Sequence, residues 1–288
     1  IENVLIGGKA GDALTDADFN VVLGAFALTT DTLGSKSTAI GAATLNKQNF
    51  TTATDSLNTA VGFSAGKEVT TGTVNTLIGG LAGDALTSGN SNVAVGYGSL
   101  TTDTLGDRNV AIGVSALESQ NFTTTTDVYN VAVGYTAGQS VTTGFQNTLI
   151  GGFAGAALTD ADYNIAIGYG ALSSDTLGSR SVAIGRTALE VQNFTTATNA
   201  YNVAIGFAAG EVVTVGQLNT LVGSLAGNAL TSGGDNVAIG YSALSAEDGH
   251  GLNVAVGSQA LRVQNAGANA YNVGVGYNSG GAVTTGTH

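Results

Sequence analysis

The chain has 288 residues, of which 44 are Gly and none is Cys, Pro, Met or Trp, and its formal net charge is -12. Without Cys there is no disulfide framework, and eight scattered Lys and Arg residues argue against nucleic-acid binding, which needs clustered positive charge. No apolar run has the length of a membrane span and no signal peptide opens the chain, which begins at Ile1 and is expected to be a segment of a longer protein.

A five-residue motif recurs along the whole chain. Asn-Val-Ala-Ile-Gly stands complete at 202–206 and 236–240, and variants run from residue 3 to residue 276. We number each repeat from its first residue, which is Asn except at Ser37 and Ser181; position five is always Gly. The repeats follow one another by 17, 17, 21 and 17 residues, and by 17, 17 and 19 in the last set, which defines superrepeats at 1–72, 73–144, 145–216 and 217–288 within one expected domain. Such periodicity is typical of a solenoid.

Later positions distinguish the four repeats within each superrepeat. Position nine follows the order Gly, Leu, Leu, Gly, as at Gly83, Leu100, Leu117 and Gly138. The third repeat is the long one and carries Gln-Asn-Phe-Thr-Thr, which the last superrepeat loses in part.

Positions two to four are a short β-branched or small apolar run that Gly ends, which predicts a strand and a turn. We expect a second strand in the Leu-Thr or Val-Thr-Thr segment of each repeat. The prediction is an all-β parallel solenoid of 16 coils, about 75 Å long if strands stack about 4.8 Å apart. Helix is excluded by the apolar spacing. Alternation puts positions two and four on one face, predicted to be the interior, and position three on the other, predicted to need a partner.

Stacking would place equivalent residues above one another, so that position one becomes a column of Asn side chains that hydrogen-bond along the solenoid. Gly at position five would supply a positive φ or room for another backbone. The alternative is an Asn row that binds a ligand. The residues predicted to form this structural ladder are Asn58, Gly62, Asn130, Gly134, Asn202 and Gly206.

The repeats Ser181–Gly185 and Asn202–Gly206 resemble the head repeats of trimeric autotransporter adhesins, and Asn58–Gly62 and Asn236–Leu244 resemble repeats of phage tail-fibre proteins. The resemblance covers all sixteen repeats. It implies a left-handed, homotrimeric β-roll that serves as a stiff stalk or head. The 72-residue superrepeat of this chain departs from the one-unit repeat of those families.

The sequence offers little chemistry, and we predict no enzyme activity and no cofactor. His250 is interpreted as a loop residue, because it has no repeated partner; a left-handed β-helix acyltransferase, which would use a catalytic His, is the disfavoured reading. Asp pairs in two turns are weak Ca²⁺ candidates, because carboxylates two residues apart can join backbone oxygens around the ion. These pairs are Asp16 with Asp18 and Asp160 with Asp162.

The long third repeats should project from the solenoid, and projecting loops often carry function. Their Phe50, Phe122 and Phe194 are candidate surface contacts, or else fold back as lids on the coil. The function predicted is a rod-like structural segment of an extracellular trimeric fibre or adhesin, on a virion or a cell surface, which supports attachment to a host glycan or receptor. A monomeric glycan- or ice-binding solenoid is the alternative.

Overall fold

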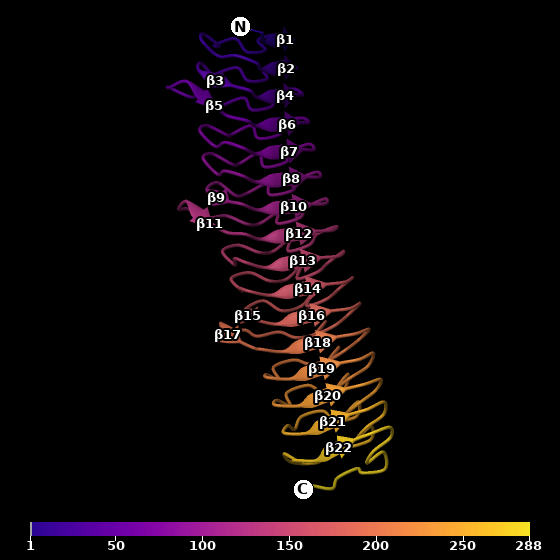
Figure 1. The fold of residues 1–288 in the computed structure, drawn as a ribbon. Helices are drawn as coiled ribbons and strands as arrows, with labels where there is room; N and C mark the ends of the chain where they lie inside the picture. Colours follow the sequence, from indigo (N-terminus) through magenta and orange to yellow (C-terminus); the bar gives the residue numbers. More distant parts are fainter. Residues whose placement is uncertain (1) are drawn as a thin grey trace. The chain divides into compact units, whose positions relative to one another are not determined.

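A computed structural model describes residues 2–288, which are all-β (Figure 1). The chain divides into two compact units, one that ends at Thr143 and one over Gly144–His288. Each unit is a stack of eight coils, with one three-residue parallel strand in every coil. The predicted β-solenoid is therefore confirmed. Residues 2–288 contain no helix of the length and apolarity that crossing a membrane requires.

In the first unit the stacked strands lie in the order β1-β2-β4-β6-β7-β8-β10-β12. Their bounds are β1 Val4–Ile6, β2 Val21–Leu23, β4 Thr38–Ile40, β6 Thr59–Val61, β7 Thr76–Ile78, β8 Val93–Val95, β10 Val110–Ile112 and β12 Val131–Val133. Two-residue strands form separate pairs beside them, β3 Gly34–Ser35 with β5 Thr54–Asp55, and β9 Gly106–Asp107 with β11 Thr126–Asp127. Both pairs link a second repeat to the long third repeat.

The second unit repeats this plan in the order β13-β14-β16-β18-β19-β20-β21-β22. The bounds are β13 Thr148–Ile150, β14 Ile165–Ile167, β16 Val182–Ile184, β18 Val203–Ile205, β19 Thr220–Val222, β20 Val237–Ile239, β21 Val254–Val256 and β22 Val273–Val275. One two-residue pair accompanies them, β15 Gly178–Ser179 with β17 Thr198–Asn199. Every three-residue strand thus coincides with positions two to four of a repeat.

Equivalent residues of neighbouring coils pair directly, as the register of Ala111 with Ala94 and Ala132 shows. The predicted second strand in the Leu-Thr and Val-Thr-Thr segments is wrong. There the backbone makes isolated bonds between coils, such as the N–H of Thr70 to the carbonyl of Thr87 at 2.8 Å. The next residues bend away, so within residues 2–288 no ladder develops in those segments.

The predicted orientation of the strand is also wrong. Position three, expected to face outward, is fully buried, as Ala94, Ala111 and Leu77 show. Positions two and four point outward instead, because the residues of positions three and nine already occupy the interior. The β-branched residues of positions two and four are therefore on the surface, and the core is mostly Ala and Leu with a few Val such as Val22 and Val69.

The core explains the Gly-Leu-Leu-Gly order of position nine. A Cβ added to Gly66 would come within 2.6 Å of Leu77 Cδ1, and one added to Gly83 within 2.8 Å of Leu77 Cδ2. Leu77, at position three, therefore occupies the space that the two Gly residues leave open. In the second and third coils of the superrepeat that contains Leu77, position three is Ala94 or Ala111, and position nine is the buried Leu100 or Leu117. Because such a core is closely packed, the side chains at positions three and nine of one coil cannot simply be replaced by those of another coil.

Candidate functional site

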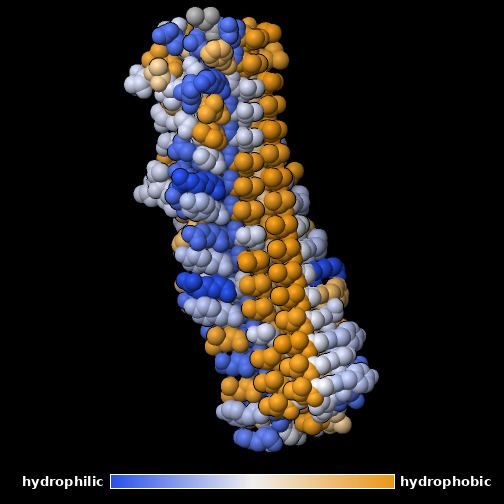
Figure 2. All heavy atoms as spheres, in the orientation of Figure 1, coloured by the Kyte–Doolittle hydropathy of each residue, from blue (hydrophilic) through white to orange (hydrophobic). Residues whose placement is uncertain are grey.

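The outward residues of the strands form what we call the strand face, positions two and four of every coil. All of them are Val, Ile, Leu or Thr, and none carries a charge. Stacked neighbours cover part of each side chain, yet Ile78, Ile112 and Ile239 remain 37–38% exposed. Figure 2 shows hydrophobic side chains gathered in a stripe along the strands. Contiguous apolar patches of this kind mark interaction sites.

Aromatic residues border the strand face on both sides. Just after the Gly of position five lie the exposed Phe63, Tyr97, Tyr135, Tyr169, Phe207, Tyr241 and Tyr277. Just before position one lie the exposed Phe19, Tyr129, Tyr163, Tyr201 and Tyr271. Basic residues in this second column pair with the protruding loops, since Lys36 bonds to Asp55 at 2.5 Å and Arg108 to Asp127. These two cations therefore belong to local ion pairs.

The Asn column lies inside the coils. Asn202 Nδ2 donates to the carbonyl of Gly216 at 2.7 Å, which closes its own coil, and Asn202 Oδ1 accepts the N–H of Asn219 in the next coil at 2.9 Å. Asn58 makes the same pair of bonds, to Gly72 and from Asn75. Both side chains are buried, so their amides are occupied by the backbone.

Asn130 is buried too, and its N–H donates to Asn109 Oδ1 at 3.3 Å. The ladder glycines adopt φ values of +138° at Gly62 and Gly206 and +143° at Gly134. A Cβ on Gly62 would also lie 2.4 Å from the carbonyl oxygen of Gly79. Positive φ and room for the next backbone, proposed as alternatives, are thus both required at Gly62.

Sequence reasoning missed a buried polar network that joins the second, third and fourth coils of the first three superrepeats. Asn130 Nδ2 donates to Gln120 Oε1 at 2.9 Å, and Gln120 Nε2 donates to Asp103 Oδ2 at 2.6 Å. Asp103 Oδ1 accepts the N–H groups of Gly106 and Phe122. Burial raises the pKa of the Asp103 carboxyl above its ordinary value. The same arrangement joins Asp31 with Gln48 and Asp175 with Gln192.

The candidate surface contacts of the long repeats are lids instead. Phe50, Phe122 and Phe194 are only 5–8% exposed, because their rings cover the buried Asp and its Gly. The three residues that follow each Phe are exposed and lead into the short strands β5, β11 and β17. The surface-contact interpretation of these three side chains is therefore wrong, while the loops themselves do project (Figure 1).

The Ca²⁺ candidates remain pairs. Asp162 Oδ1 accepts the N–H of Phe145 at 3.0 Å, and burial raises the pKa of the Asp162 carboxyl. The N–H of Asp18 donates to Ser35 Oγ at 2.9 Å, which fixes its turn. Among residues 2–288 the structure assembles three His or carboxylate ligands in one place, and neither Asp16 with Asp18 nor Asp160 with Asp162 is in it.

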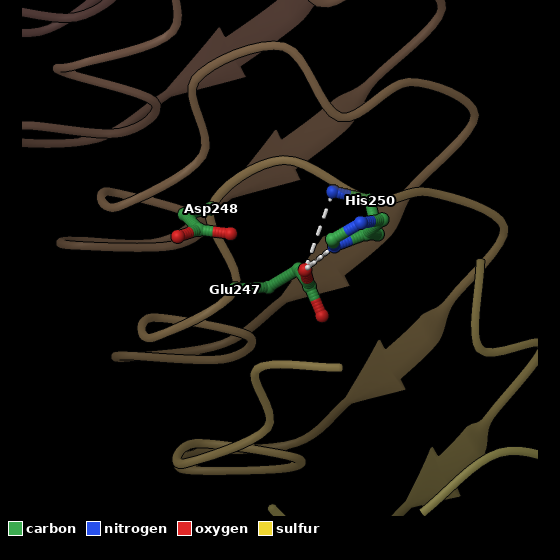
Figure 3. Close-up of side chains that lie close together, drawn as sticks. All are labelled: Glu247, Asp248 and His250. Atoms are coloured by element: carbon green, nitrogen blue, oxygen red, sulfur yellow. Dashed lines mark hydrogen bonds and ion pairs between the residues drawn. The ribbon is translucent and has the colours of Figure 1, made fainter. Parts of the chain in front are cut away.

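That place is the turn of Glu247, Asp248 and His250 (Figure 3). His250 Nδ1 lies 3.3 Å from Glu247 Oε1, and the buried Glu247 also accepts the N–H of His250 at 3.3 Å. Glu247 occupies the place of Asp103 in the network, with Gln264 Nε2 3.3 Å from its Oε2. The cluster thus arises because Glu247 replaces the Asp of the buried network. His250 stands where the other superrepeats have Gly.

Comparison with protein-family models, curated proteins and solved structures finds no match for this chain.

Proposed function

We propose that the chain is a structural segment of an extracellular fibre or adhesin, on a virion or a cell surface, that associates with two further copies of itself through the strand face. The observation that carries the proposal is the uncharged β-branched surface that each stack of strands presents. A second copy would offer the same residues at the same spacing between coils, so the two surfaces match without adjustment. The resemblance of the repeats to trimeric adhesins and tail fibres supports three copies.

The size of the face suits stable association. A three-residue strand with its aromatic borders is about 20 Å wide, and eight coils about 4.8 Å apart extend about 38 Å. Each unit therefore presents roughly 760 Å², close to the ~800 Å² that one partner buries in a standard interface. The parallel pairing between coils holds equivalent residues of this surface in register, which would suit a stalk that carries load.

Light scattering of the native protein tests the proposal, with a trimer as the expected result. Ile112→Lys places a charge in the middle of the strand face, where three copies would bring like charges together, so we expect monomers that keep their β circular dichroism. Thr124→Lys, on an exposed loop, is the matched control and should remain trimeric. A monomeric wild-type protein would refute the proposal.

The alternative that this experiment separates is a monomeric ice-binding solenoid. Ice binding favours a regular Thr array, whereas the strand face carries Thr only at Thr38, Thr59, Thr76, Thr148 and Thr220. The Thr70 hydroxyl is itself bonded to the carbonyl of Thr87 at 3.1 Å. The chemistry of the surface therefore favours association over ice.

A further inference from the structure

A cleft of about 310 Å³ opens on the surface of the second unit, in the turns that follow β13, β14 and β16. It is lined by Phe153, Ala156, Tyr169, Gly170, Ser173 and Glu190. The rings of Phe153 and Tyr169 form an edge-to-face pair, with centroids 5.6 Å apart and planes at 78°. Two perpendicular rings form an apolar corner, and the hydroxyl and the carboxylate complete the lining.

The cleft exists because position seven is Gly170. A Cβ built there would have its nearest neighbours at 3.7–4.0 Å, in Glu190, Thr187 and Ser173, so the space is free. The next coil carries Thr187 at the same position with φ +55°, and Gly170 itself has φ +67°. A side chain is thus compatible with this backbone, and its absence at Gly170 leaves the hollow.

The equivalent place 72 residues earlier shows what is special here. There Thr101 Oγ1 donates to the carbonyl of Leu81 at 2.7 Å and to Asp84 Oδ1 at 3.0 Å, and Glu118 Oε2 accepts from Gln139 Nε2 at 2.6 Å. In that copy the Thr101 hydroxyl and the Glu118 carboxylate both hydrogen-bond within the protein.

Four replacements distinguish the cleft from that copy. Phe153 stands for Leu81, Ala156 for Asp84, Ser173 for Thr101 and Glu211 for Gln139. The Ser173 hydroxyl has lost its acid acceptor and the Glu190 carboxylate its amide donor. Among residues 2–288, neither side chain has another protein hydrogen-bond partner, so both are available to a ligand that also contacts the rings.

We propose that this cleft binds one neutral hexopyranose unit of a glycan. A pyranose has an apolar C–H face, which is attracted by the negative face of an aromatic ring, and a rim of hydroxyls. The hydroxyls would donate to Glu190, as charge-assisted bonds, and exchange hydrogen bonds with Ser173. The volume lies at the small end of ligand pockets, which suits a single sugar.

The lining argues against charged ligands. Two carboxylates, Glu190 and the neighbouring repeat's Glu211, outnumber the nearby cation Arg186, whose guanidinium carbon lies 6.0 Å from the centroid of the Tyr169 ring, so the net local charge repels acidic sugars. An ammonium ion would be attracted by the acids, but it would keep much of its water in an open cleft, where contact with a ring contributes little. A neutral sugar is the ligand that uses the rings, the hydroxyl and the carboxylate together.

Saturation-transfer NMR with the methyl pyranosides of galactose, glucose and mannose tests the proposal, with tetramethylammonium as the cationic probe. We expect at least one pyranoside to bind with a dissociation constant on the order of 1 mM. Gly170→Thr should abolish binding by filling the cleft. Tyr169→Ala and Glu190→Gln should weaken it by about tenfold or more.

Gly98→Thr is the matched control, because Gly98 is the equivalent residue 72 positions earlier, beside engaged polar groups; it should leave binding unchanged. Absence of binding by all three pyranosides, equal binding by Gly170→Thr, or binding of tetramethylammonium alone would each overturn the proposal. The cleft lies within one chain, so its test is separate from that of the strand face. A trimer that binds no sugar would refute only the cleft, and a monomer that binds sugar only the trimer.

Discussion

Replacing Gly113 by Ala tests how closely the coils stack. Gly113 has φ +135°, and an added Cβ would lie 2.2 Å from the carbonyl oxygen of Gly134 in the next coil. The backbone conformation alone costs an L side chain about 1–3 kcal/mol. Relief of the clash requires the two coils to move apart, which weakens the bonds from Gly134 to Ile112 and from Thr136 to Val114, each worth about 1 kcal/mol. We therefore expect a loss of about 3–5 kcal/mol in the free energy of unfolding.

Gly276 provides the matched control, because its φ is +120° but nothing lies within 4 Å of the added Cβ. Gly276→Ala should show the conformational term only, about 1–3 kcal/mol. Because solenoids can unfold coil by coil, urea unfolding is combined with a local measurement. Amide hydrogen exchange is followed at Gly134 for Gly113→Ala and at Gly276 for Gly276→Ala. Equal losses for the two variants would refute the argument that coil contact makes this Gly necessary.

Three further predictions concern the buried network. Gln120→Ala removes the amide donor of Asp103 Oδ2 and the carbonyl to which Asn130 Nδ2 donates, so urea unfolding should show a loss of about 2–5 kcal/mol; a loss below 1 kcal/mol would mean that water replaces the amide. Phe122→Ala should lower stability by about 3–5 kcal/mol and expose the loop before β11 to protease, whereas an unchanged protease pattern would contradict its role as a lid. Because burial raises the pKa of Asp103 and Asp175, the folded chain holds protons that the unfolded chain releases above its ordinary value of 3.8. The free energy of unfolding should therefore rise as the pH falls from neutral through the raised pKa, and Asp103→Asn should reduce that slope; an equal slope in the variant would refute this assignment.

The positions of the strands were predictable because Gly fixes the end of each one. Asn202–Gly206 predicts a strand, and β18 spans Val203–Ile205. Period-two alternation also correctly places positions two and four on one face. It does not say which face is inside when both are apolar. Position three, which is Ala in most coils, lies inside, as Ala94, Leu77 and Val22 show.

A signal in the sequence could have corrected the orientation. Position three is Leu77 where position nine of its own and the preceding coil is Gly, and Ala94 where position nine is Leu100. Such compensation in volume implies that positions three and nine face each other inside the coil. Gln264 likewise persists where the last superrepeat has lost its Phe, which marks Gln as a buried network residue.

The cleft could not be predicted in the same way. Its lining comes from three successive coils, and its polar groups are free only because Ala156 and Glu211 differ from residues 72 positions earlier. Each replacement is unremarkable along the sequence. Only the stacking brings Phe153, Tyr169 and Glu190 to one place.

The complementarity of Leu77 with Gly66 and Gly83 sets the step by which such a chain can change its length. Removal of a single first repeat would take away its position-three Leu, such as Leu77, and leave a void at the position-nine Gly of the preceding coil, such as Gly66. Removal or duplication of 72 residues restores every neighbour, the Asp and Gln pair included. Recombination between gene copies would therefore yield folded proteins in increments of four coils, and length would vary in jumps.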